Sequence, residues 1–159
     1  MKIVLIAMIC LFAVGCTATQ LQPTAMPIPT LTPTESPCDD GKIASYINDY
    51  SNQYSEWTDA LDLASSTPKI NLAPQIENLQ RIKREITPLE PPLCLQLSHD
   101  STIQYMEKMI EGFLGYMSGK TDVETAKLFE EGGALLDIST AELNKIIECM
   151  PNCAQNYKN

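Results

Sequence analysis

The chain of 159 residues carries 20 acidic side chains against 11 basic ones, a formal net charge of −9 at pH 7. This acidic balance argues against nucleic acid as a partner and against adhesion to anionic lipid by charge. Three phenylalanines, one tryptophan and few β-branched runs occur, so the composition favours helices over strands.

The N-terminus begins with Lys2 and an apolar run over residues 3–14. This run is shorter than the roughly 20 residues of a membrane-spanning helix but suits a signal peptide. It ends in AVGC at residues 13–16, which resembles the lipobox of bacterial lipoproteins. The resemblance implies that residues 1–15 are removed and that Cys16 receives a diacylglyceryl group and an acyl chain such as palmitate. We therefore expect a protein of the cell envelope, held by its lipid on the extracytoplasmic face of a bacterial membrane.

Residues 16–37 form a linker in which prolines and threonines dominate and Glu35 is the single charged residue. Such a segment cannot bury a core, and its prolines favour extended polyproline II. At about 3.1 Å per residue, the 21 residues after Cys16 reach at most roughly 65 Å. We expect a spacer, and it resembles the tethers of surface lipoproteins whose roles are uncharacterised.

Residues 38–159 are long enough for one domain with a single core. Apolar residues recur at intervals of three and four over residues 43–64, 72–86, 103–117 and 129–150, as on one face of a helix. Short connections separate these stretches. The pattern predicts an all-α domain, an up-down-up-down four-helix bundle that follows a disordered Thr/Pro-rich tether.

Two features mark the fourth predicted helix. Thr121 and Glu124 have the spacing of a capping box at its start. Gly132 and Ser139 lie on its apolar seam, and we expect these small residues to make room for a bulky neighbour, such as Trp57 or a tyrosine of the first helix.

Four cysteines remain in the domain besides the lipidated residue: Cys38, Cys94, Cys149 and Cys153. The predicted topology places all four at one pole of the bundle. An even number of cysteines outside the cytoplasm predicts disulfides, with three possible connectivities. We favour Cys38–Cys94 with Cys149–Cys153. A four-thiolate zinc site is the functional alternative, although the paired C-x-x-C spacing of such sites is missing, and so is the spacing of a redox pair.

His99 is the one histidine of the chain and lies in line with the third seam, so we expect it to be buried near a helix start. The sequence has no second histidine for a di-iron site, no recognisable partners for a catalytic triad and no glycine-rich phosphate loop. With Met106 or Met109, His99 could hold copper or haem. Our expectation is a protein with no catalytic residue, no metal and no cofactor.

A second stripe on the third helix consists of Tyr105, Met109, Gly112 and Tyr116. A wide apolar arc is typical of the most buried helix of a bundle, but it also suits a docking face for another protein or a ligand. Two functions therefore stay open. The first is a non-catalytic interaction or scaffold module for another envelope protein. The second is an extracytoplasmic binding protein for a metal ion or small apolar ligand, using His99 with the methionines or the cysteine pole.

Overall fold

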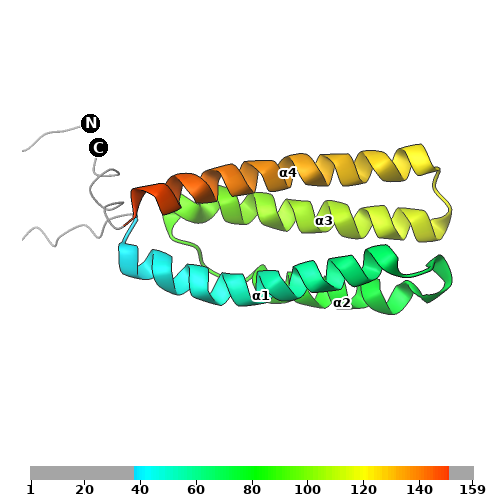
Figure 1. The fold of residues 1–159 in the computed structure, drawn as a ribbon, viewed down its shortest axis with the longest axis horizontal. Coiled ribbons are helices and arrows are strands. Elements are labelled where there is room, and N and C mark those ends of the chain that lie inside the picture. Colours follow the sequence, from blue (N-terminus) through cyan, green and yellow to red (C-terminus); the bar gives the residue numbers. More distant parts are fainter. Residues whose placement is uncertain (1–37, 151–159) are drawn as a thin grey trace, which may run out of the picture. The chain divides into compact units, whose positions relative to one another are not determined.

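The computed structural model describes residues 38–150, and within this range it contains four long helices and no strand. The helices are α1 (Asp40–Ser66), α2 (Ala73–Ile86), α3 (Gln96–Ser118) and α4 (Asp122–Cys149), with short 3-10 helices η1 (Lys69–Asn71) and η2 (Leu93–Leu95) before α2 and α3. Successive long helices run in opposite directions along one long axis (Figure 1). The predicted all-α bundle is confirmed, whereas the predicted signal peptide, the tether and Cys153 lie outside the described residues.

Local sequence signals set the helix ends. The Asp39 carboxylate accepts a hydrogen bond from the Lys42 N–H (3.0 Å) at the start of α1. The predicted capping box is present at α4, where the Glu124 N–H donates to the Thr121 hydroxyl (3.3 Å) and the Thr121 N–H donates to the Glu124 carboxylate (3.0 Å). Helix α3 ends at Gly119, whose φ of 86° lies in the left-handed region that glycine adopts without strain.

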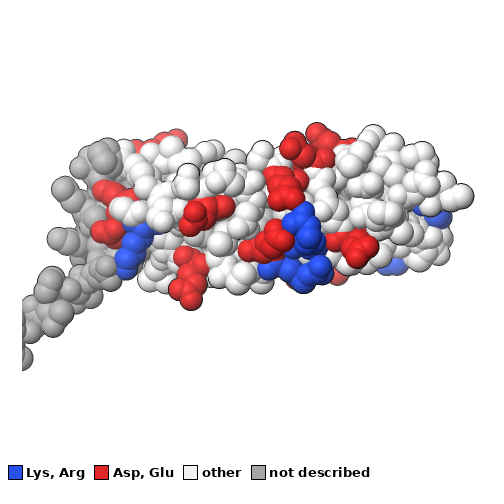
Figure 2. All heavy atoms as spheres, turned by 90° about the horizontal axis from the view of Figure 1, so that it is seen from below, with Lys and Arg blue, Asp and Glu red and all other residues white. Residues whose placement is uncertain are grey.

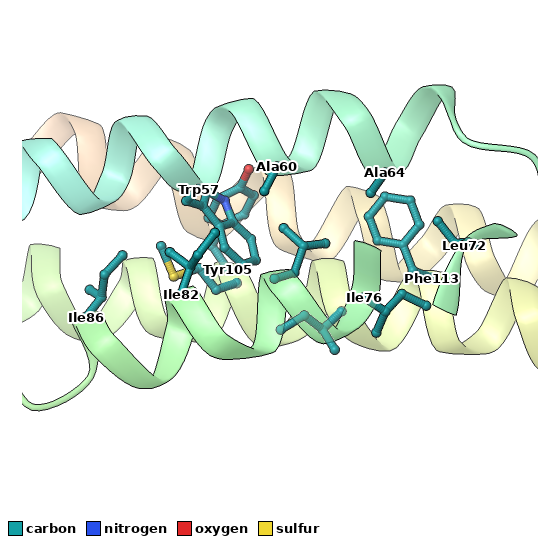
Figure 3. Close-up of a cluster of buried hydrophobic side chains, with 12 residues drawn as sticks. Trp57, Ala60, Ala64, Leu72, Ile76, Ile82, Ile86, Tyr105 and Phe113 are labelled. Carbon is teal, nitrogen blue, oxygen red and sulfur yellow. The ribbon is translucent and has the colours of Figure 1, made fainter. Parts of the chain in front are cut away.

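The apolar seams predicted from the sequence supply the core. Trp57 of α1 is fully buried and meets Tyr105 of α3 edge to face, with ring centroids 6.0 Å apart. Ile82 of α2 lies beside this pair, Ile86 lies on one side of it, and Ile76, Phe113 and Leu72 continue the cluster along the bundle on the other side (Figure 3). A second cluster, centred on Ile43, Leu95 and Ile146, fills the end where α1 begins and α4 ends.

Helices α3 and α4 make the most extensive contact of the bundle, because small residues on each helix leave room for side chains of the other. A Cβ atom on Gly112 would lie 2.4 Å from the ring of Phe129, and one on Gly132 would lie 3.2 Å from the Met109 sulfur. Ser139 is buried against α3 as well. The space left by Gly132 and Ser139 is thus filled by α3, and our expectation of a bulky neighbour from the first helix was wrong.

We predict that Gly112→Ala and Gly133→Ala have opposite effects on stability. Both replacements gain about 1 kcal/mol of helix propensity. A methyl group at Gly133 meets nothing within 4 Å, whereas at Gly112 it overlaps the Phe129 ring, which packs on Phe113. Overpacking costs about 1–3 kcal/mol, so the Gly112 variant should unfold that much more easily than the Gly133 variant. Urea denaturation measures the difference, and equal midpoints would contradict the close approach of α3 and α4.

Candidate functional site

The pole where α1 begins carries the predicted disulfide. Cys38 and Cys94 are bonded, with Cα atoms 5.7 Å apart and a sequence separation of 56, so this pairing is confirmed. A loop of that length corresponds to about 4 kcal/mol of loop-closure entropy. Cys149 packs at the same pole and is also disulfide-bonded, while its predicted partner Cys153 lies outside the described residues. We call this end the disulfide pole.

The zinc alternative does not fit the disulfide pole, because cysteines joined in a disulfide cannot serve as thiolate ligands. Between residues 38 and 150, no group of three His, Cys, Asp or Glu side chains is placed to hold a metal ion.

His99 is buried beside the disulfide pole and joins three parts of the chain. Its Nδ1 lies 2.8 Å from the hydroxyl of Tyr46 on α1, and its ring also bonds to the backbone of Thr87, the residue that follows α2. A backbone carbonyl only accepts, so the ring donates to Thr87 through Nε2. Nδ1 is then the acceptor and Tyr46 the donor. Both ring nitrogens are therefore engaged within the bundle.

Burial controls the ionisation of this pair. It lowers the pKa of His99, although the nearby Asp100 carboxylate and the Thr87 bond act in the opposite direction. Burial also raises the pKa of Tyr46, so its hydroxyl keeps the proton that it donates. The neutral histidine is the form that fits the bundle.

A separate chain of hydroxyls lies next to this pair in the bundle. The Thr102 hydroxyl lies 3.0 Å from that of Tyr50 on α1 and 2.7 Å from that of Ser139 on α4, and Ser139 also pairs with Ser98 (3.1 Å). These contacts link three helices through side chains that satisfy one another. A search for apolar periodicity does not find Ser98 and Thr102, because both residues are polar. They lie eight and four residues before Met106, so their spacing places them on the same buried face of the helix and could have revealed them.

The stripe predicted as a partner or ligand face is largely covered by α4. Tyr105 is 5% exposed, Gly112 lies beneath Phe129, and Met109 is half-buried against Gly132. Tyr116 is exposed, and the Lys69 ammonium of η1 lies 5.1 Å from its ring centroid. Three of the four residues thus serve the packing of α3 on α4, and the stripe offers no continuous docking face in this bundle.

Exposed apolar side chains gather instead at the end opposite the disulfide pole. This end of the bundle lies at the right of Figure 1. We call this end, formed by residues 63–74 and 114–124, the tip. Ile70 is 89% exposed and Val123 is 79% exposed. Of the nine large hydrophobic side chains exposed among the described residues, five lie at the tip: Leu63, Ile70, Leu114, Tyr116 and Val123. Clustered exposure of this kind is typical of an interaction surface.

We predict that His99 makes the stability of the protein fall in mild acid. Because the pKa of His99 is lowered in the folded state, the unfolded chain binds more protons once pH falls below about 6.5. The unfolding free energy should therefore decrease from about pH 7.5 to pH 5.5, above the range in which most carboxylates titrate. His99→Gln, which keeps a donor and an acceptor but does not titrate there, should remove most of this decrease. Urea titrations at both pH values measure it, and parallel curves for both proteins would refute a role for His99.

No described helix is both long and apolar enough to cross a membrane. No protein-family model, curated protein or solved structure matches the chain. The role of the domain can therefore be inferred only from its own residues and contacts.

Proposed function

We propose that this chain is a lipid-anchored cell-envelope protein whose helical bundle is a non-catalytic interaction module. In this proposal, Cys16 carries the lipid and the Thr/Pro-rich segment spaces the bundle from the extracytoplasmic face of the membrane. The observation that carries the interaction role is the tip, where apolar side chains as exposed as Ile70 and Val123 gather at one end of the bundle.

The position of the tip supports the proposal. The tether joins the bundle at Cys38, in the disulfide pole, and α1 of 27 residues separates that pole from the tip by about 40 Å. The bundle would thus hold its apolar surface away from its point of attachment. The disulfide and the bonds of His99 brace the attached end, so the tip is presented by a rigid element.

The polar side chains in the interior of the bundle support a structural role and not a catalytic one. The imidazole of His99 and the hydroxyls of Tyr46, Thr102 and Ser139 bond to one another or to the backbone. A nucleophile or general base needs a position from which it reaches a substrate. These buried groups instead hold α1, α3 and α4 together.

The lipid anchor is tested by replacing Cys16. We expect the full chain to incorporate an alkynyl palmitate in a bacterial host, and Cys16→Ser to abolish labelling and leave residues 1–15 uncleaved. Cys10→Ser is the matched control, because Cys10 lies within the apolar run and not in the lipobox, so it should label normally. Gel fluorescence and intact mass give the result. Labelling of Cys16→Ser would show that another residue carries the lipid, and an unaltered chain that fails to label would show that the anchor is absent.

The interaction role is tested by charging the tip. In a mild detergent extract of the envelope, the full chain should migrate on a native gel as a complex larger than one copy. Ile70→Asp with Val123→Asp should dissociate it, because the aspartates charge exposed apolar positions and cost the fold only about 0.5 kcal/mol each. Leu93→Asp with Leu97→Asp at the opposite end is the control and should leave the complex intact. Migration of the unaltered chain as a single copy would count against an interaction module.

A further inference from the structure

We infer that the occupant of the tip is a second copy of this chain, so that two lipid-anchored bundles pair tip to tip. The inference rests on the proposed function, since it assigns a partner to the surface that carries it. A contact between two identical copies places the same patch on both sides, and this patch must therefore complement itself in charge and in apolar surface.

The charge distribution meets this requirement at the tip. Residues 38–150 hold 9 basic and 19 acidic side chains, a formal charge of −10, so two copies repel each other along most of their surface. At the tip, Lys69 and Lys120 balance Asp122 and Glu124, and the formal charge is zero. At the right-hand end of the face shown in Figure 2, basic side chains are visible and acidic ones are not. Copies can therefore approach here with the least repulsion.

The two lysines of the tip are placed to face a partner. Neither takes part in an ion pair within the described residues, in contrast to Arg81, Lys83 and Lys108. The stem of Lys120 lies against Gly115, and the Lys69 ammonium lies over Tyr116. Their stems thus follow the surface. Lys120 also interacts electrostatically with Glu124 of the same chain, but neither lysine is held in an ion pair of the described residues that would keep it from a carboxylate of another molecule. In a paired arrangement, Asp122 of the second copy supplies such a carboxylate beside the exposed Val123.

Confinement to a membrane makes a small contact sufficient. The end of one bundle offers less area than the roughly 800 Å² per partner of a stable soluble complex. Two chains on the same membrane are, however, held at a high effective concentration. The 21-residue tether reaches up to roughly 65 Å, more than the length of about 40 Å of α1. Two bundles attached at their disulfide poles can therefore lie along the membrane with their tips in contact.

Photo-crosslinking in the intact envelope tests this pairing. The full, lipidated chain carries p-benzoylphenylalanine in place of Val123, and two versions with different epitope tags are expressed together. We expect an adduct that contains both tags. Leu93, which is 71% exposed at the opposite end, is the matched control position and should yield none. Lys69→Glu with Lys120→Glu in both copies should lower the adduct about tenfold, because like charges then face each other. Asp122→Asn should lower it to a smaller extent, because it only removes one carboxylate that pairs with these lysines.

The remaining outcomes separate this inference from the proposed function. An adduct at Val123 with a different protein, or with lipid alone, would overturn the second copy as the occupant. The protein adduct would leave the interaction module standing. A doubly tagged adduct at Leu93 but none at Val123 would overturn the tip as the contact while keeping self-association. No adduct at either position, together with a single-copy band on the native gel, would overturn both.

Discussion

The close approach of α3 and α4 is the constraint on which the interior of the bundle depends. Their backbones come so near that a single methyl group on Gly112 would overlap the ring of Phe129. Tyr105, which borders Gly132 of α4, also reaches α1, where it meets the buried Trp57 edge to face. The volume that a glycine leaves on one helix is thus filled by a large side chain of the neighbouring helix, as a close-packed interior requires.

The contact between α1 and α3 depends on side chains that are both long and polar at the end. Tyr46 and Tyr50 stack along α1, with ring centroids 5.6 Å apart, and each ends in a hydroxyl that needs a partner once it is buried. His99 and Thr102 of α3 are those partners. The one histidine of the chain is therefore explained by packing: it accepts from a tyrosine and donates to the connection after α2, which brings three segments into register.

Much of this fold follows from the sequence, because each helix buries one apolar face and the cysteines fall where an up-down topology brings chain segments together. Periodicity within a helix does not reveal which neighbour it meets. Gly132 and Ser139 indicated a close contact, but only the arrangement of all four helices identifies α3 as their neighbour. Polar residues on a buried face also escape a hydrophobic pattern, so α3 begins at Gln96, seven residues before the predicted seam.

The exposed tip was harder to foresee, since Ile70 and Val123 stand in or beside connections and belong to no apolar seam. Their significance comes from position and charge together. The net acidic charge of the domain makes its copies repel each other as a whole, and the apolar end with a formal charge of zero lacks that net charge. In the proposed arrangement, the lipid confines the chains to a surface and the tether gives them reach. Specificity for the tip then requires no large interface, because the tip combines exposed apolar side chains with a formal charge of zero.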